Sequence, residues 1–496
     1  MPQTLPLLHG EITYSFAKEE EKRPWIEAIV AHHLNLGASY TCCMDDAENW
    51  LHGSFNLCVP VAIQSQDSQQ RVLLRLPLPY RVGDAFRPGN GDEKIRCETG
   101  AYAWLQENCP DVPIPTLYGF ATSTGETYTR LENLPFLSRC FQQIRRRLLS
   151  WFSLPIPTIY IRHQCPSHSV DDKVTGAGYL LLEYIDKEQG EMLSNTWPEK
   201  RFDTRLRTNL FHDLSKILLN ITRTPLPKIG SFIIDQDGFL RLSNRPLSLE
   251  IQDLENEKIP TNMPQNYTYS TVDSYIADIL RIHDNRIRHQ PNAINNTGDY
   301  IYQTSALTAM RTTYSSFFNP ELRRGPFVFT LTDLHQSNIF VDSNWHITAL
   351  VDLEWACIRP IEMLRTPAWL TNKAVDEISE EPEEYNIIRT ELLDALTSEE
   401  TKLSKDNTLS TIMNKGWNTG TFWYSLALAS PTGLFAVFYN QIQPRFLENC
   451  PEHDTFEHIM PWYWARDWVK TAADKLSDRG KYDAELKQVF ESTGVD

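Results

Sequence analysis

The sequence predicts an α+β chain with two lobes, a smaller one built on antiparallel strands followed by a larger, mainly helical one. Two observations predict this. Short apolar and β-branched runs separated by turn residues dominate the chain up to about residue 186. From about residue 187 onward, apolar residues recur at helical spacing instead. At 496 residues, 41% of them hydrophobic, the chain is long enough for one large two-lobed domain or for two to three small ones.

Three segments follow from this pattern. Residues 1–50 are expected to form a helical extension, residues 51–186 the small lobe and residues 187–496 the large lobe. No internal repeat and no long low-complexity tract interrupts this order. The extension contains a short apolar stripe at helical spacing, made of Ile26, Ile29, Val30 and Leu34.

The small lobe opens with a predicted hairpin at residues 51–63, whose turn lies near Gly53, and a further strand at 71–77. Residues 82–93 are rich in glycine, proline and charge, and we expect a surface loop there. This loop leads into a helix that begins at Lys94. The inward positions of that helix are Ile95, Tyr102 and Leu105.

A strand at residues 116–120 follows, and a buried strand at 178–185 closes the lobe. Between them lies an insertion, residues 121–177, which contains the basic amphipathic piece RRRLLSWF at 145–152. Two interpretations fit this piece: a cationic helix packed over the small lobe, which we favour, or a helix on a membrane surface.

The large lobe is predicted to be mainly helical. A core helix is expected at residues 202–224, and a hairpin with an Asp-Gly turn at 230–240. Further helices are expected at 272–282 and, at the C-terminal end, at 464–492. The C-terminal half is rich in acidic and aromatic residues, which suits a polar or cationic acceptor.

Charge and cysteine content limit the class of protein. The net charge is −17, from 64 acidic and 47 basic residues, which opposes binding to nucleic acid through its phosphates. The nine cysteines are dispersed and form no C-x-x-C pattern, as expected for reduced thiols. We see no secretory signal, and no apolar run reaches the roughly 18 residues that span a bilayer. The sequence therefore predicts a cytoplasmic protein with no nucleic-acid or membrane partner.

The most informative stretch is LTDLHQSNIFVD at residues 331–342, followed by LVDLEW at 350–355. It places Asp333, then Asn338 five residues later, then Asp352 at the end of the next apolar run. A tight loop, a strand, a polar turn and a returning strand would bring the two aspartates and the amide close together. Phosphoryl transfer needs these residue types, because a carboxylate orients the attacking hydroxyl and oxygen ligands hold Mg²⁺ against nucleotide phosphates.

These two loops resemble the catalytic and metal loops of the aminoglycoside phosphotransferase and choline-kinase-like family, a branch of the protein-kinase fold. The strings TDLHQSNIFVD and VDLEW, with NRPL at 244–247, are similar to the fungal branch of that family. The chain departs from the family at Leu331, where the family has a His that helps to shape the loop. The resemblance covers residues 50–365 and extends loosely to the C-terminal helices. It implies a bilobal protein-kinase-like fold.

Roles for the loop residues follow from their chemistry. Asp333 is the candidate base that orients the hydroxyl and accepts its proton. Asn338 and Asp352 are the candidate Mg²⁺ ligands. His335 either contacts phosphate or makes a structural hydrogen bond. Glu354 either supports a ligand or caps local backbone, or it is a second metal ligand.

The resemblance also implies a nucleotide site in the small lobe. Where the family has a Lys on its third strand, this chain has Arg75, and Glu98 is the matching acid on the helix. Arg and Lys are not interchangeable in geometry. A phosphate loop is expected at Gly53, although it has a single glycine, and the connection at Glu183 and Tyr184 is expected to hold adenine through its backbone.

The sequence therefore favours an ATP- and Mg²⁺-dependent phosphotransferase that acts on a hydroxyl group of a small molecule. Its partners are a nucleotide and a small-molecule acceptor. The alternative is a catalytically degenerate kinase fold that binds or scaffolds without transferring phosphate. Leu331 and Arg75 favour that alternative, whereas Asp333, Asn338 and Asp352 together oppose it.

Overall fold

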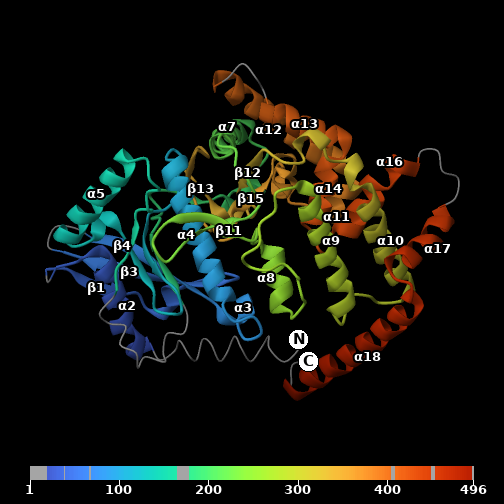
Figure 1. The fold of residues 1–496 in the computed structure, drawn as a ribbon, viewed down its shortest axis with the longest axis horizontal. Coiled ribbons are helices and arrows are strands. Elements are labelled where there is room, and N and C mark those ends of the chain that lie inside the picture. Colours follow the sequence, from blue (N-terminus) through green and yellow to red (C-terminus); the bar gives the residue numbers. More distant parts are fainter. Residues whose placement is uncertain are drawn as a thin grey trace.

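The small lobe is built on one antiparallel sheet, shown at the left of Figure 1. The computed structural model describes residues 19–37, 39–65, 69–164, 178–403, 408–447 and 453–493. Within them the sheet has eight strands in the order β1-β3-β4-β8-β5-β6-β7, with β2 also paired to β3. The strands are β1 (Thr41–Met44), β2 (Leu51–His52), β3 (Asn56–Gln64), β4 (Gln69–Pro77), β5 (Leu117–Ala121), β6 (Thr127–Arg130), β7 (Tyr160–Arg162) and β8 (Tyr179–Glu183).

Two helices cover the two faces of this sheet. Helix α2 (Glu19–Leu34) packs on one face and helix α4 (Asn90–Asn108) on the other. Because side chains alternate along a strand, Leu181 of β8 joins the core under α2, whereas Leu180 and Leu182 join the core under α4. The stripe predicted for the extension lies in the first of these cores through the buried residues Ile26, Ile29 and Val30.

Helix α4 begins earlier than the sequence predicts. Residues 82–93 are not one surface loop, because the short helix α3 (Pro79–Val82) precedes a turn and α4 already starts at Asn90. Gly89 takes the N-cap position with φ of 95°, a conformation that glycine adopts without strain. Asp92 and Glu93 then lie in the first turn, where negative charge is favourable. The acidic residues that suggested a loop therefore stabilise a helix start.

The insertion extends the sheet and adds one helix at its rim. Strands β6 and β7 continue the sheet beyond β5, and helix α5 (Phe136–Trp151) lies between them in sequence at the outer edge of the lobe (Figure 1). The last part of the insertion, residues 165–177, lies outside the described residues.

The large lobe is mainly helical and also contains small sheets. The β10-β11 hairpin has its predicted Asp-Gly turn, with Gly238 at φ of 83°. Two more sheets, β12-β15 and β14-β13-β9, lie near the junction of the lobes. The strands are β9 (Glu191–Met192), β10 (Ser231–Ile234), β11 (Leu240–Asn244), β12 (Phe327–Thr330), β13 (Ile339–Val341), β14 (Ile347–Leu350) and β15 (Cys357–Pro360).

The predicted helices at 202–224, 272–282 and 464–492 correspond to α7, α9 and α18, and α10 was not predicted. The helices are α6 (Trp197–Lys200), α7 (Thr204–Thr222), α8 (Leu249–Asn256), α9 (Val272–His289), α10 (Thr297–Thr313), α11 (Val375–Glu380), α12 (Pro382–Leu403), α13 (Thr408–Thr419), α14 (Thr421–Leu428), α15 (Leu434–Val437), α16 (Pro444–Leu447), α17 (His453–Trp464) and α18 (Trp468–Thr493). A π-helical stretch, Phe438–Ile442, follows α15.

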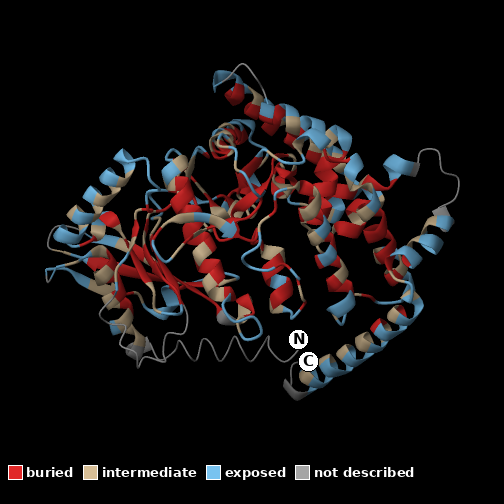
Figure 2. Ribbon diagram, in the orientation of Figure 1, coloured by how far each residue is buried: buried red, intermediate tan, exposed pale blue. Residues whose placement is uncertain are grey.

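An antiparallel sheet with helix α4 packed on one face, a short connection after β8 and a large helical lobe define a two-lobed, protein-kinase-like fold. The predicted fold class is therefore confirmed. Figure 2 shows that buried residues run through both lobes and across their junction. Among the helices that the structure describes, none combines the length and apolar character needed to cross a membrane.

Candidate active site

A cleft of about 1270 Å³ lies between the two lobes. The β2-β3 turn and strand β4 line it from the small lobe, and the loops that follow β12 and β14 line it from the large lobe. Most of the predicted site residues therefore face one space. Those that line it are Gly53, Arg75, Glu183, Tyr184, Asp333, His335, Asn338 and Asp352.

The two loops of the large lobe lie side by side because direct hydrogen bonds join them. The hydroxyl of Thr332 donates to the carbonyl oxygen of Trp355 at 2.6 Å. The backbone N–H of Val351 donates to the carbonyl oxygen of Asn338 at 3.0 Å. The hairpin of β13 and β14 thus returns the chain to its starting point, as the sequence predicts, and Asp352 comes next to the loop of Asp333.

Asn338 and Asp333 contact each other directly. The Nδ2 of Asn338 donates to the carbonyl oxygen of Asp333 at 3.0 Å and to its carboxylate Oδ2 at 3.3 Å. The Oδ1 of Asn338 accepts a long hydrogen bond of 3.4 Å from the Ser337 hydroxyl. Asp352 has φ of 62°, a strained conformation for a residue with a side chain. Such strain persists where the surrounding structure holds the residue in place, and in this conformation Asp352 lines the cleft.

Arg75 of β4 joins the two lobes by ion pairs. Its guanidinium lies 2.5 Å from Glu98 of α4 and 2.9 Å from Glu354, and it also contacts Asp352. Arg75 is 5% exposed, so these pairs lie in a poorly solvated setting where charge interactions are strong. The strand arginine and the helix acid expected from the resemblance therefore do pair, although Glu98 lies behind Arg75 rather than on the cleft wall.

Lys94 is a residue that the sequence reasoning missed. It lies one helical turn before Glu98 on α4, and its Nζ is 2.6 Å from Glu354 and 2.5 Å from the Asn56 Oδ1. The available signal was the i, i+4 spacing of Lys94 and Glu98, which places both on one face of the helix. We call Arg75, Lys94, Glu98, Asp352 and Glu354 the cleft cluster.

Glu354 connects the members of the cleft cluster. Its Oε2 accepts from Arg75, from Lys94 and from the Asn56 amide, the last at 2.9 Å. Its Oε1 is buried and has no hydrogen-bond partner among the described residues. Glu354 is thus held on one oxygen by side-chain donors and carries one oxygen with no donor. This arrangement fits support of a ligand or a second metal ligand, and not a backbone cap.

The electrostatics of the site are dominated by carboxylates. Burial, followed by the charges of Asp352 and Glu354, raises the pKa of Asp333 to about 7. Burial also raises the pKa of Glu98 to about 7, although Arg75 opposes the shift. For Asp352, burial and Glu354 together raise the pKa despite Arg75. Lys94 and Arg75 outweigh burial only at Glu354, whose pKa is lowered.

These observations test whether Mg²⁺ fits the residues predicted to hold it. Asn338 and Asp352 offer oxygen donors from adjacent loops, which is the ligand type that Mg²⁺ prefers. Four carboxylates (those of Asp333 and of the three acids of the cleft cluster) face two cationic side chains, and Glu354 retains an unpartnered oxygen. A divalent cation would balance this excess charge, so the donor set fits. Among the described residues, no group of three or more His, Cys, Asp or Glu side chains is arranged to hold a metal on its own.

The other predicted residues have more ordinary surroundings. His335 is exposed and caps a 3₁₀ turn, Gln336–Asn338, by accepting from the backbone N–H of Ser337 at 3.3 Å. The Glu183 carboxylate accepts from the Thr116 N–H at 2.9 Å. Tyr184 lies under the Arg71 guanidinium, 4.6 Å from the ring centroid.

Gly53 forms the β2-β3 turn, where its N–H donates to the Asn56 carbonyl at 2.9 Å. Leu331 packs against the large-lobe core, at the position where the family that the sequence resembles has a His. Among the aromatic residues of the C-terminal half, which the sequence suggested for the acceptor, Trp423 and Tyr424 are buried in that core, whereas Trp462 is exposed. The sequence could not separate core aromatics from binding aromatics by composition alone.

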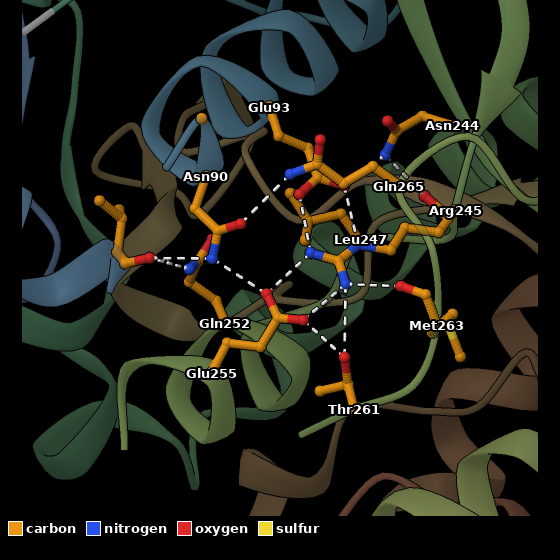
Figure 3. Close-up of polar contacts among 12 residues, drawn as sticks. Asn90, Glu93, Asn244, Arg245, Leu247, Gln252, Glu255, Thr261, Met263 and Gln265 are labelled. Atoms are coloured by element: carbon orange, nitrogen blue, oxygen red, sulfur yellow. Dashed lines mark hydrogen bonds and ion pairs between the residues drawn. The ribbon is translucent and has the colours of Figure 1, made fainter. Parts of the chain in front are cut away.

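A second buried ion network fixes helix α4 against the large lobe (Figure 3). Arg245, which follows β11, pairs with Glu93 of α4 and with Glu255 of α8, each at 2.7 Å. Each carboxylate receives two hydrogen bonds from the guanidinium, and Thr261 donates to Glu255 at 2.5 Å. We call Arg245, Glu93, Glu255 and Thr261 the Arg245 network. It holds the helix that carries Lys94 and Glu98.

Comparisons with known proteins relate the chain to structures rather than to sequences. No protein-family model and no curated protein matches it. Among solved structures it is similar to the Plasmodium vivax ethanolamine kinase, with a TM-score of 0.34 and 11% identity, covering 90% of this chain and 83% of that chain. It is also similar to spectinomycin phosphotransferase in complex with ADP and spectinomycin, with a TM-score of 0.30 and 10% identity, covering 91% and 98% of the two chains. These matches give no support to the fungal branch predicted from the sequence.

Proposed function

We propose that the protein is a small-molecule kinase that transfers a phosphoryl group from Mg²⁺·ATP to a hydroxyl. The observation that carries the proposal is the convergence of Asp333, Asn338, Asp352 and Arg75 on one cleft between two lobes. Positioning and electrostatic stabilisation supply most of the catalysis in phosphoryl transfer. The cleft provides carboxylate, amide and guanidinium groups for both purposes.

Asp333 is the group that orients the acceptor hydroxyl and takes its proton as the new bond forms. Its pKa, raised to about 7, makes it a stronger base than an ordinary Asp while it still ionises near neutral pH. The hydrogen bonds from the Asn338 amide fix the orientation of its loop.

The nucleotide would lie against the small lobe. Arg75, held by Glu98, would bind phosphate oxygens, and the β2-β3 turn at Gly53 would cover them. The base would lie between apolar side chains of the two lobes, with the connection at Glu183 and Tyr184 along its edge. The apolar residues at this end of the cleft are Leu73, Leu182, Ile185, Phe340 and Val351.

Asn338 and Asp352 would hold Mg²⁺, with nucleotide phosphates and water completing its shell. When bound, the ion would neutralise phosphate charge during transfer. It would also relieve the repulsion among Asp333, Asp352 and Glu354, which burial and proximity make unfavourable.

One observation favours the rival hypothesis, a kinase-fold protein that binds a ligand without transferring phosphate. The Arg75 guanidinium contacts the Oδ1 of Asp352, an oxygen that Mg²⁺ would need. For transfer to occur, this pair must open when Mg²⁺ and phosphate arrive. A protein in which the pair stays closed would bind nucleotide without a metal requirement, or would bind another ligand.

The first experiment is thermal unfolding with ATP, with and without Mg²⁺, followed by ADP release with a panel of hydroxylated metabolites. Wild type should gain about 2.7 kcal/mol at an ATP concentration of about 100 times the dissociation constant, and only with Mg²⁺. Asp352→Asn should lose this gain. Glu188→Gln, an exposed carboxylate on the same cleft, is the matched control and should keep it. Stabilisation without Mg²⁺, or the same gain in Asp352→Asn, would support the rival.

A further inference from the structure

Helix α5 of the insertion presents its apolar side to solvent. Five residues at helical spacing, Leu137, Phe141, Ile144, Leu148 and Trp151, form one stripe along it. They expose between 45% of their surface (Leu148) and 80% (Leu137 and Trp151). None of the 16 residues of α5 is buried, and Figure 2 shows the helix in exposed and intermediate colours only. Exposed apolar surface of this extent marks a binding surface in most proteins.

The polar side of α5 faces the small lobe, which reverses the usual orientation of a surface helix. Arg146 donates to the carbonyl oxygen of Pro157, and burial lowers its pKa. Arg139 donates to the carbonyl oxygen of Glu132 at 3.1 Å. The sequence favoured a cationic helix packed over the lobe. The structure places it there with two arginines inward, so packing against the lobe leaves the apolar stripe uncovered by the described residues.

The surroundings of the stripe are basic although the chain is acidic. Between residues 130 and 162 the sequence has six arginines and one glutamate, in a protein of net charge −17. Arg145 and Arg147 lie one and three residues after Ile144, and on a helical projection they flank the apolar arc on opposite sides. A stripe of Leu, Phe, Ile and Trp between arginines is the pattern of a helix that lies in the plane of a membrane interface.

We propose that α5 docks the protein onto an anionic membrane surface, with the stripe Leu137 to Trp151 among the acyl chains and the flanking arginines at the lipid headgroups. This revises the expectation that the protein has no membrane partner. It does not depend on the chemistry of the cleft. The charge argues for lipid over a second copy of the chain, because a symmetric contact through α5 would place the arginines of both copies together.

The test is flotation of the full chain with vesicles of phosphatidylcholine alone or with 30% phosphatidylserine. We expect binding to the anionic vesicles, at least about tenfold weaker with phosphatidylcholine alone and reduced by high salt. Leu137→Ser/Trp151→Ser should lose at least about tenfold in binding. Phe202→Ser/Tyr463→Ser removes two comparably exposed aromatics elsewhere, 68% and 78% exposed, and should bind like wild type.

Two charge-reversal variants distinguish the effect of the α5 arginines from the effect of net charge. Arg145→Glu/Arg147→Glu should lose binding, whereas Lys481→Glu/Lys487→Glu on α18 makes the same change in net charge and should retain it. Melting temperatures verify that each variant is folded, and the salt dependence of wild type needs no variant. The proposal is overturned if wild type does not float, or if the α5 variants bind like their controls. It is also overturned if light scattering shows that wild type dimerises through this stripe without binding vesicles.

Discussion

Helix α4 carries two buried ion clusters whose environments differ. In the Arg245 network, one arginine satisfies two carboxylates with paired hydrogen bonds, and polar neighbours complete the set. Carboxylates outnumber cations by one in both clusters, but in the cleft cluster the Glu354 Oε1 has no partner among the described residues and the charge of the nearby Asp333 adds to the acidic groups. The two clusters are neighbours on this helix. Glu93 belongs to the Arg245 network, whereas Lys94 and Glu98 belong to the cleft cluster.

The pKa directions express the same difference. In the Arg245 network, hydrogen bonds and charge from Arg245 outweigh burial and lower the pKa of Glu255. In the cleft cluster, burial and neighbouring acids raise the pKa of Glu98 and Asp352, and the same causes raise that of Asp333 beside it. The satisfied network fixes the helix, whereas the cleft cluster, with its unpartnered carboxylate oxygen, lies where we propose that a cation binds. Perturbed carboxylates therefore distinguish the site from the scaffold more clearly than burial does.

The largest expected effect is on turnover. Asp333→Asn removes the group that we propose accepts the hydroxyl proton, and we expect the phosphoryl-transfer rate to fall by about 10²–10⁴-fold. Mg²⁺·ATP binding, measured by thermal shift, should be retained because Asn338 and Asp352 are unchanged. His335→Ala is a comparison on the same loop, and its exposed side chain predicts a smaller loss. Equal rates for Asp333→Asn and wild type would contradict the proposed role.

The next effect is on stability. Arg245→Met leaves Glu93 and Glu255 buried without their cation, and we expect a loss of about 3–5 kcal/mol in the free energy of unfolding by urea. The triple variant Arg245→Met/Glu93→Gln/Glu255→Gln should recover much of this loss, because no unpaired charge remains. Arg281→Met, which breaks an exposed ion pair on α9, is the control and should cost at most about 1 kcal/mol. If Arg245→Met costs no more than this control, the network is not a stabilising element.

The sequence predicts those features whose residues lie close together along the chain, and it does not predict contacts between distant residues. The hairpin that carries Asp333, Asn338 and Asp352 was predictable because its turn, strands and polar ends lie within about 25 residues of sequence. The pairing of Arg75 with Asp352 spans 277 positions and followed from no local pattern. Lys94 was overlooked because a lysine on an amphipathic helix normally faces solvent, whereas here it is fully buried.

The Arg245 network is a second example of long-range contacts that the sequence does not predict. NRPL at residues 244–247 suggested only a resemblance, because the partners of Arg245 lie on α4 and α8. The orientation of α5 was equally beyond the sequence. Its amphipathic pattern predicts a helix with two different sides, and only tertiary contacts, such as those of Arg139 with Glu132 and of Arg146 with Pro157, show which side meets the lobe. Periodicity thus predicts that a helix forms, whereas tertiary contacts determine which of its sides is buried.

A smaller effect should appear in the pH dependence of stability without Mg²⁺. Folding raises the pKa of Asp333 from 3.8 to about 7, so the folded state binds this proton more tightly and loses stability as pH rises across that window. Asp333→Asn lacks this penalty. Its free energy of unfolding relative to wild type should therefore increase by about 2 kcal/mol from pH 5 to pH 8.

Glu255 supplies the control of opposite sign. Burial opposes its charge, but hydrogen bonds and charge from Arg245 outweigh burial and lower its pKa below 4.5. Arg245 stays charged over the whole range, so the stability that ionised Glu255 contributes changes little between pH 5 and pH 8, and Glu255→Gln should show a nearly constant deficit. Parallel curves for Asp333→Asn and wild type would show that the raised pKa of Asp333 is not a property of the folded protein.

The smallest effect concerns a single hydroxyl of the Arg245 network. Thr261 is buried and donates to Glu255 at 2.5 Å, so Thr261→Val removes one charge-assisted hydrogen bond with little change in volume. We expect a loss of about 1 kcal/mol in the free energy of unfolding, because Arg245 still satisfies the carboxylate. Thr304→Val is the matched control, since Thr304 is equally buried but donates to a helix carbonyl, that of Tyr300, at 2.7 Å. The Tyr300 carbonyl also accepts the helical N–H bond. Thr304→Val should therefore lower the free energy of unfolding by less than Thr261→Val does. A larger loss for Thr304→Val than for Thr261→Val would mean that the network is already over-satisfied, and the contrast between the two clusters on α4 would then rest on Arg245 alone.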